Sequence, residues 1–266
     1  MKVQTVKLVY FSPTATTRAI VKEITKGIKA EQVQHLDCTL PGSRTAPMPV
    51  FQDELVILAA PVYVGRIAKV AAEHFATFRA RNTLAVLVAV YGNRAYEDAL
   101  RELRDLAVQS GFMPIAGGAF IGEHSYSSEQ KPIAHGRPDT QDRHHARAFG
   151  AKIREKLQQI ETIAAIKPLT VPGNFPYRDP GTLPPMAPVT NISLCTLCGK
   201  CAHICPVNAI ATENPATSDE NICTHCCACI KICPAQARSV QNEIMLNIVN
   251  RLHTTCQARK EPEVFL

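Results

Sequence analysis

Short, almost wholly apolar runs recur through the first two-thirds of the chain. Three of them are rich in valine, isoleucine and leucine, and lie at Val6–Phe11, Leu55–Ala60 and Leu84–Tyr91. Runs of this length and composition are typical of strands buried on both faces of a parallel sheet. Val33–Thr39 alternates between apolar and polar residues, which predicts an edge strand, and Phe112–Gly122 contains a fifth strand. The pattern therefore predicts five strands.

Between these strands, apolar residues recur at helical spacing. The predicted helices are Thr16–Ala30, Ile67–Arg79, Arg94–Ser110 and Asp142–Ile163. Strands separated by helices imply βαβ units and a sheet covered on both faces. The predicted fold class is therefore α/β, with a doubly wound, five-stranded parallel sheet.

The composition changes abruptly after residue 166. The segment "KPLTVPGNFPYRDPGTLPPMAPV" is rich in proline and has no periodicity, which predicts a semi-rigid extended linker. A cysteine-rich segment follows, and the last residues carry a helical pattern in "NEIMLNIVNRLHTTC". We predict a domain over residues 1–166, a linker over 167–190, a small α+β domain over 191–240, and a C-terminal helix and tail over 241–266.

No apolar run in the chain reaches transmembrane length, so we expect no membrane span. The first residues, "MKVQTVKLVYF", show neither a signal peptide nor a lipidation motif, and this favours a cytoplasmic protein. In that compartment thiols stay reduced. Clustered cysteines therefore indicate metal ligands rather than disulfides.

Nine of the eleven cysteines lie in one short region, and eight of them form two matching runs. Each run has the spacing C-x2-C-x2-C-x3-C-P, typical of bacterial ferredoxins that bind [4Fe–4S] clusters. Three cysteines three apart in a tight loop can surround one face of a cluster. The fourth begins a helix that leads away, and the proline after it suits the first turn of that helix.

In two-cluster ferredoxins the fourth cysteine of each run ligates the opposite cluster. This predicts cluster 1 on Cys195, Cys198, Cys201 and Cys233, and cluster 2 on Cys223, Cys226, Cys229 and Cys205. A pair of structural zinc sites is the alternative, although zinc modules usually separate two C-x2-C pairs by a longer spacer. Cys227 fits neither register; we interpret it as a packing residue, with a ligand swap as the alternative.

A loop rich in hydroxyl side chains follows the first strand. In "YFSPTATTRAI", Ser12, Thr14, Thr16 and Thr17 stand where a helix begins, and free amides at a helix N-terminus bind phosphate well. The loop lacks the lysine of a Walker A motif, and it is not a G-x-G-x-x-G fingerprint. An ordinary helix cap by serine or threonine is the alternative.

Two later loops favour the phosphate site. The third and fourth strands end in "APVYVGRIAK" and "AVYGNRAYEDAL", each with a tyrosine and a glycine. In a sheet of order 2-1-3-4-5, the carboxyl ends of strands 1, 3 and 4 meet at the switch point, where FMN is among the ligands that bind. A tyrosine can stack on a flat ring, and a glycine permits a peptide to flip beside it.

The N-terminal region resembles flavodoxin, and the whole chain resembles the bacterial flavodoxin–ferredoxin fusion proteins. The resemblance is carried by "FSPTATTR", "APVYVGRIAK", "YGNRAYEDAL", "GGAFIGEHSYS", both cysteine runs and "RKEPEVFL". It implies a bound FMN, with a phosphate loop, two walls around the ring, an aromatic stack at Tyr96 and a glycine near N5 at Gly65. The FMN-binding residues that it implies are Ser12, Thr14, Ala15, Thr16, Thr17, Pro61, Val62, Tyr63, Val64, Gly65, Tyr91, Gly92, Asn93 and Tyr96.

The phosphate loop departs from the usual flavodoxin pattern T-G-x-T, because Ala15 stands in the place of the glycine. If that position requires a positive φ, alanine costs roughly 1 kcal/mol. His124, in the polar loop "GEHSYSS" after the fifth strand, is either a proton donor to the flavin or a hydrogen-bonded loop residue, and we favour the latter.

The formal net charge of +6 would suggest acidic partners, but the implied cofactors change the balance. Each cluster with its four thiolates carries about −2, and an FMN phosphate adds up to about −2, so the loaded protein is close to neutral. No lysine- or arginine-rich block supports nucleic-acid binding.

These features predict an electron-transfer protein that couples FMN to two [4Fe–4S] clusters, with other redox proteins as partners. A flavin-dependent reductase of a small acceptor such as a quinone, fed by the clusters, is the alternative. A third hypothesis is a cluster-binding module with an empty flavodoxin domain, for which Ala15 is the argument.

Overall fold

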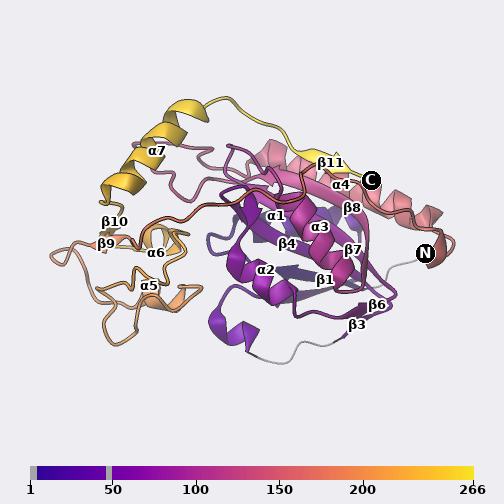
Figure 1. The fold of residues 1–266 in the computed structure, drawn as a ribbon, viewed down its shortest axis with the longest axis horizontal. Coiled ribbons are helices and arrows are strands. Elements are labelled where there is room, and N and C mark those ends of the chain that lie inside the picture. The colour runs from indigo at the N-terminus through magenta and orange to yellow at the C-terminus, as the bar shows by residue number, and fades with distance from the viewer. Residues whose placement is uncertain (1–4, 46–49) are drawn as a thin grey trace.

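A computed structural model describes residues 5–45 and 50–266, and Figure 1 shows a larger part built on a sheet beside a smaller, loop-rich part. Five parallel strands form the centre of the sheet, and all five correspond to predicted strands. In spatial order they are β2 (Gln32–Asp37), β1 (Thr5–Tyr10), β4 (Leu55–Tyr63), β7 (Thr83–Tyr91) and β8 (Phe112–Ile121). The order of the predicted strands is therefore 2-1-3-4-5, with the alternating strand at the edge.

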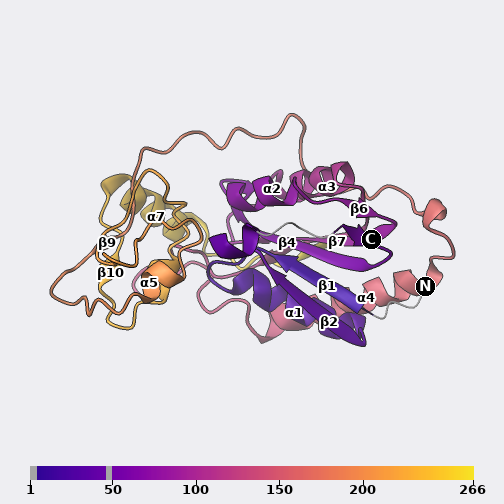
Figure 2. The same cartoon turned by 90° about the horizontal axis from the view of Figure 1, so that it is seen from below.

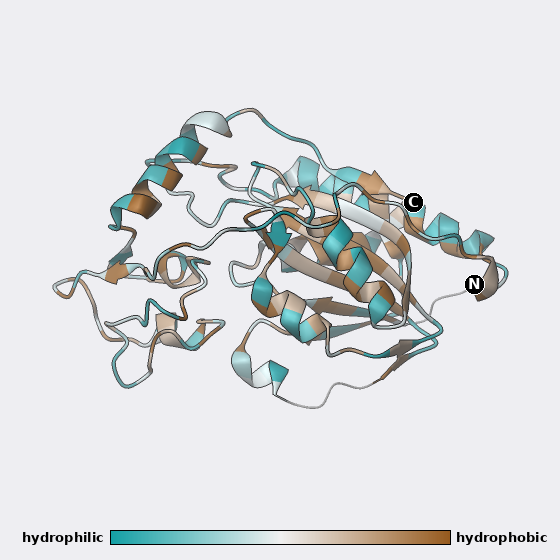
Figure 3. Cartoon of the chain, viewed as in Figure 1, coloured by the Kyte–Doolittle hydropathy of each residue, from teal (hydrophilic) through white to brown (hydrophobic). Residues whose placement is uncertain are grey.

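Helices cover both faces of this sheet, as Figure 2 shows. On one face α1 (Thr16–Ile28) and α4 (Thr140–Gln159) pack against each other and against the sheet. On the other face lie α2 (Lys69–Phe75) and α3 (Ala99–Gln109). The strands are apolar and the outward faces of the helices are polar (Figure 3). The predicted doubly wound α/β architecture is therefore confirmed.

Two predicted helices begin later than expected because the preceding chain makes other structure. β4 turns back into β5 (Arg66–Ile67), which delays the start of α2. The loop before α3 contains Asn93 and Glu97, both with positive φ, so the helix begins only at Ala99. α4 begins two residues earlier than predicted, because the side chain of Asp139 caps it and Asp142 completes a capping box.

The smaller part consists of two short helices, a two-stranded ribbon and a longer helix. α5 (Lys200–His203) and α6 (Ala228–Lys231) each lie inside one cysteine run. β9 (Val189–Thr190) pairs with β10 (Arg238–Ser239), and α7 (Glu243–Thr255) is the predicted C-terminal helix. The remaining short elements are η1 (Pro41–Arg44), β3 (Phe51–Gln52) paired with β6 (Ala80–Arg81), and η2 (Ile163–Ala165).

After α7 the chain returns to the larger part, which the sequence pattern did not predict. Its last strand, β11 (Glu263–Phe265), pairs antiparallel with β8 and extends the central sheet by one strand. The side chain of Asn93 fixes the approach by donating to the carbonyls of Cys256 and Ala258 at 2.8 and 2.9 Å. Residues 241–266 therefore contact both parts of the molecule.

The proline-rich linker has neither helix nor strand over residues 167–188, but it is anchored along its length. Tyr177 donates to Asp105 at 2.7 Å, and the guanidinium of Arg66 lies 4.5 Å from the Tyr177 ring centroid. The amide of Arg178 donates to Asp98 at 2.6 Å. The linker therefore runs along α3 before it enters the smaller part.

The two parts also contact each other directly. Arg44 donates to the carbonyl of Pro206 at 2.5 Å, and Lys231 forms an ion pair with Glu123 at 2.6 Å. Leu252 of α7 packs with Ile133 of the larger part in a small buried cluster. These contacts hold the cysteine-rich part against the carboxyl ends of the strands (Figure 1).

Candidate functional site

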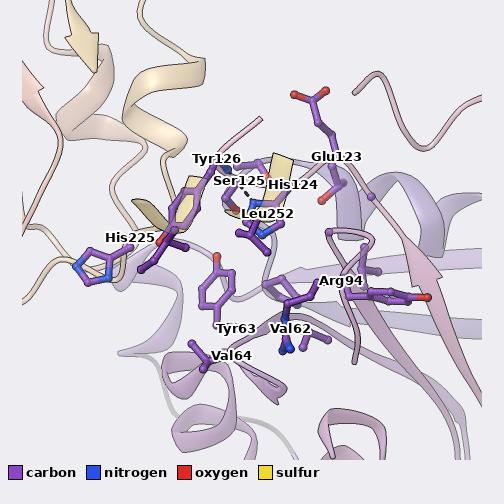
Figure 4. A pocket seen from close by; sticks show the side chains of 18 of the residues that line it. Val62, Tyr63, Val64, Arg94, Glu123, His124, Ser125, Tyr126, His225 and Leu252 are labelled. Carbon is purple, nitrogen blue, oxygen red and sulfur yellow. Dashed lines mark hydrogen bonds between the residues drawn. The ribbon is translucent and has the colours of Figure 1, made fainter. Parts of the chain in front are cut away.

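A cavity of about 270 Å³ lies where the carboxyl ends of β1, β4, β7 and β8 face the smaller part. This is close to the lower end of the range for ligand pockets, about 300–1,000 Å³. The strand ends and their loops form its inner walls. The linker, the loop of the second cysteine run and α7 form its outer walls, through Arg178, Thr224, His225 and Leu252 among others. Figure 4 shows His225 and Leu252 at this wall.

Eight of the fourteen residues implied for FMN line this cavity together, although they come from three separate loops. They are Thr14, Thr16, Pro61, Val62, Tyr63, Val64, Tyr91 and Gly92. The doubly wound topology places these loops side by side at the switch point. The other six, Ser12, Ala15, Thr17, Gly65, Asn93 and Tyr96, do not line it.

The hydroxyl-rich loop leads directly into the first turn of α1. Ser12 Oγ accepts the amide of Arg18 at 3.0 Å, so this hydroxyl caps the helix. Ala15 has φ 64° and ψ −3°, the left-handed conformation that glycine adopts at little cost. Thr17 Oγ1 is buried and has no hydrogen-bond partner among the described residues. An unpartnered buried hydroxyl beside a helix N-terminus fits an anion-binding loop.

The loop after β4 forms a tight hairpin with Val64 and Gly65 at its turn, and both have positive φ. A Cβ on Gly65 would lie 1.7 Å from Oε2 of Glu97, so a larger residue would displace the end of that side chain, and the positive φ favours glycine on its own. The neighbouring Tyr63 extends into the cavity (Figure 4). Burial raises its pKa well above 10, with a further contribution from Cys226, so its hydroxyl stays protonated at neutral pH.

The loops after β7 and β8 meet at Gly92. A Cβ on Gly92 would lie 2.3 Å from Cδ2 of His124, so only glycine leaves this histidine in place. The ring nitrogen Nδ1 of His124 accepts the amide of Tyr126 at 3.0 Å. Burial lowers the pKa of His124 to about 4. His124 is therefore a neutral, hydrogen-bonded loop residue, as we favoured from the sequence.

Tyr96 and Asn93 are held away from the cavity by the C-terminal tail. Tyr96 packs on Tyr91, with ring centroids 5.5 Å apart, and donates to Glu263 of β11 at 2.8 Å. The Asn93 side chain binds the tail backbone, as described above. The structure therefore does not bring Tyr96 to the position of an aromatic stack, because β11 supplies a buried partner for it instead.

Several cavity residues were missed by the sequence analysis because they come from distant segments. Tyr126 follows β8, while Thr224 and His225 belong to the second cysteine run. His225 Nε2 donates to the carbonyl of Met186 at 2.9 Å, which fixes its ring against the end of the linker. Tyr63 and Tyr126 lie between His124 and His225 in Figure 4. No local sequence pattern predicts this part of the cavity wall, because its residues come together only in the folded chain.

The eight cysteines of the two runs gather in two rings, each around a small cavity. The first ring holds Cys195, Cys198 and Cys201 with Cys233 from the other run. The second ring holds Cys223, Cys226 and Cys229 with Cys205. We call these the first ring and the second ring. Each run thus contributes three thiols to one ring and its fourth thiol to the other.

An internal repeat of 28 residues relates the two runs, from Cys195 to Cys223 onward. The amide of Ala209 donates to Cys205 Sγ at 3.2 Å, and its counterpart Ala237 donates to Cys233 Sγ at 3.3 Å. Gly199 and Cys227 are also equivalent, and both have left-handed backbone at the start of a short helix. Cys227 is 2% exposed and lines the same small cavity as the four thiols of the second ring.

The two rings differ in their surroundings. In the second ring, burial raises the pKa of Cys226 to about 11 and that of Cys229 to about 12. In the first ring Cys198 is exposed, and a hydrogen bond from the Lys200 amide lowers its pKa. Thr224 lines both the second ring and the cavity at the strand ends. The second ring is therefore next to the cavity, and the first ring is open to solvent.

Residues 188–211, which include the first cysteine run, match the 4Fe-4S binding domain family. No curated protein matches the chain. The N-terminal part is similar to three flavodoxins of known structure. An archaeal flavodoxin is 11% identical over 58% of this chain and 99% of that chain, with a TM-score of 0.36. Flavodoxin 1 from Bacillus cereus is 14% identical over 57% of this chain and 97% of that chain, with a TM-score of 0.43. Fusobacterium nucleatum flavodoxin bound to flavin mononucleotide is 16% identical over 57% of this chain and 98% of that chain, with a TM-score of 0.39.

The strand order and the cysteine runs define the class of this protein. Its larger part has the flavodoxin-like fold, and its smaller part contains a 4Fe-4S binding segment. The chain thus combines a flavodoxin-like domain and a ferredoxin-like domain. Within residues 5–45 and 50–266, no helix has the length and apolar character needed to cross a membrane.

Proposed function

We propose that this protein is an electron-transfer protein that holds FMN in the cavity and a [4Fe–4S] cluster in each thiol ring. The observation that carries the proposal is the position of Thr224, which lines both the cavity at the strand ends and the second ring. A flavin site and a cluster site that share a wall residue are close enough to exchange electrons within one chain. Two such carriers in separate proteins would first have to meet by diffusion.

The residues at the cavity fit FMN. Thr14 and Thr16 at the cavity wall suit a phosphate group at the start of α1, and the unpartnered hydroxyl of Thr17 follows them in the chain, behind this wall. The loops at Pro61–Val64 and Tyr91–Gly92 suit the two sides of a flat ring. FMN, when bound, supplies the exchange of either one or two electrons, whereas each cluster exchanges one.

Crossed ligation is supported by the composition of the rings. Cys205 adds to the electrostatic rise in the pKa of both Cys226 and Cys229, after the larger effect of burial, as expected for a thiol beside them. Cys233 lines the first ring and not the second. We therefore propose the crossed set, with Cys205 on cluster 2 and Cys233 on cluster 1.

A carrier role is favoured over reduction of a small acceptor such as a quinone. The linker, α7 and the second cysteine run line the cavity opposite the strand loops, which reduces the room for a small acceptor beside a bound flavin. His124 is the imidazole at its wall beside the strand loops, and because its pKa is about 4 it is neutral at pH 7 and has no imidazolium proton to donate.

The first ring is the proposed contact point with a partner redox protein. Leu197, at the tip of its loop, is 64% exposed, whereas its repeat counterpart His225 is held against the linker and lines the cavity. Cys198 beside it is exposed. We therefore propose that electrons enter or leave the chain through the first ring, by contact with a one-electron carrier.

Cofactor analysis of anaerobically purified protein tests this proposal. We expect about eight irons and eight acid-labile sulfides per chain, because each of two clusters contains four of each. We also expect one FMN, and not FAD, because the loop provides a single anion site. Stoichiometric zinc without sulfide would contradict the clusters, and iron and sulfide without flavin would leave a cluster module with an empty flavodoxin domain.

A further inference from the structure

The internal repeat is broken at one buried position next to the rings. One residue after Ala209 stands Ile210, and one residue after Ala237 stands Arg238. Both side chains are buried, with 5% and 3% exposure. Ile210 lines the second ring and Arg238 lines the first. The two rings, alike in their cysteines, therefore differ by one buried positive charge.

The Arg238 guanidinium is directed at a ligand sulfur of the first ring. Nη1 donates to Cys201 Sγ at 3.5 Å and to the carbonyl of Pro215 at 3.0 Å. Nη2 donates to Ser218 Oγ and to the carbonyl of Pro188 at 3.4 Å. No carboxylate is among these partners. Arginine stays positively charged in proteins, so its charge is balanced here by the dipoles of these oxygen groups and by the anionic cluster proposed for the ring.

The second ring is also within electrostatic reach of Arg238. Its guanidinium donates to Ser218 and Pro188, and both of these residues line the second ring. The direct hydrogen bond, however, goes to Cys201 of the first ring. Both clusters should therefore be affected by this cation, and cluster 1 more strongly.

Reduction adds one negative charge to a cluster. A buried cation and a hydrogen bond to a ligand sulfur stabilise that added charge, and solvent exposure does the same, so each raises the reduction potential. The first ring has all three, through Arg238 and the exposed Cys198. The second ring has Ile210 in place of the arginine, and its Cys226 is only 8% exposed.

We propose that Arg238 sets the potential of cluster 1 above that of cluster 2, so that electrons move preferentially from the flavin side of the molecule to its exposed end. This rests on the proposed function, since it requires both clusters to be present. Arg238 acts as a positioning and tuning residue, and it changes no bond. The competing explanation is that Arg238 only holds the fold, through its hydrogen bonds to Pro188 and Pro215. In that case its replacement would leave the reduction potentials of both clusters unchanged.

The test is an anaerobic redox titration followed by electron paramagnetic resonance, comparing the intact protein with Arg238→Gln. We expect the reduction potential of cluster 1 to be lower in Arg238→Gln. The equilibrium constant for its one-electron reduction should fall by about tenfold or more, which corresponds to about 59 mV. Cluster 2 should shift less. Lys200→Gln is the matched control, because Lys200 also lines the first ring and this substitution removes the same charge. Unlike Arg238, Lys200 is exposed, so solvent and salt screen its charge. Arg238→Lys should restore part of the shift.

Assignment of the two signals does not depend on the arginine variants. Cys198→Ser should alter or remove the higher-potential signal, and Cys226→Ser the lower-potential one. The proposal is overturned if Cys198→Ser affects the lower-potential signal instead. It is also overturned if Arg238→Gln assembles both clusters with cluster 1 unmoved, or moved no more than in Lys200→Gln. Protein without two clusters would instead contradict the proposed function, and cofactor analysis of each preparation separates the two failures.

Discussion

Ala15 shows how far a single residue could be interpreted from the sequence. The loop pattern identified it as a substitution for glycine, and the structure gives it φ 64° at the residue before α1. What the sequence did not indicate is that Thr17, two residues later, is buried with an unpartnered hydroxyl. Backbone conformation follows from the local motif, whereas burial depends on the surrounding fold.

We expect Ala15→Gly to stabilise the protein, because glycine adopts the left-handed region without the clash that a Cβ makes there. The gain in unfolding free energy should be about 1 kcal/mol, after allowance for the greater freedom of glycine in the unfolded chain. FMN binding should be equal or tighter, since the loop is no longer strained. Denaturant unfolding and flavin titration measure the two quantities.

Ala19→Gly is the matched control for this prediction. Ala19 lies four residues further on, inside α1, where its amide donates to the carbonyl of Ala15 at 3.0 Å. Glycine in a helix interior is unfavourable by about 1 kcal/mol, so this variant should be less stable. A loss of stability or of FMN affinity in Ala15→Gly as well would show that Ala15 is not strained.

Helices and strands determined by their own sequence were predicted, whereas the short strand that depends on pairing with a distant segment was not. β4 and β7 are nine-residue strands with continuous apolar runs, and such a run is sufficient to predict a buried strand. β11 has only three residues and is stabilised by pairing with Gly117–Ala119 of β8. Its presence explains why Tyr96 is buried under the tail, with Glu263 as its partner, and does not face the cavity.

Crossed ligation is a property of the two cysteine runs as elements, and it can be tested by removing one fourth cysteine. We expect Cys205→Ser to damage chiefly the cluster held by Cys223, Cys226 and Cys229, because Cys205 lies in that ring. Cys233→Ser should damage the other cluster. Iron content, with magnetic resonance of each remaining cluster, measures the outcome. Damage from Cys205→Ser confined to the cluster of its own run would contradict the assignment.

At the scale of the whole molecule, the sequence predicted the two parts but not how they meet. The cysteine spacing and the βαβ pattern each describe one part alone. The cavity walls come from β-strand loops, the linker, the second cysteine run and α7. Contacts such as Lys231 with Glu123 join residues 108 positions apart. A single sequence contains no local signal for such contacts, since they depend on the relative placement of finished elements.

The two parts are also stabilised by different means. The larger part has a sheet with apolar clusters on both faces, built from residues such as Phe75, Leu103 and Phe149. Apart from cysteines, the buried apolar side chains of residues 191–240 are four alanines, Ile210, Pro206 and Pro215. Alanines bury little apolar area, so the hydrophobic contribution of this segment is small. Its fold should therefore depend on the bonds between its thiols and iron.

We expect removal of iron by chelation under reducing, anaerobic conditions to unfold the smaller part while the sheet remains folded. Hydrogen exchange followed by mass spectrometry should show residues 191–240 losing protection, with β1, β4 and β7 still protected. α7 and β11 should keep much of their protection, because Leu252 packs with Ile133 and β11 pairs with β8. FMN affinity should fall without being abolished, since Thr224 and His225 leave the cavity wall but the strand loops stay. Equal loss of protection throughout the chain would show that the two parts fold as one unit. Unchanged protection over 191–240 would show that this segment folds without metal.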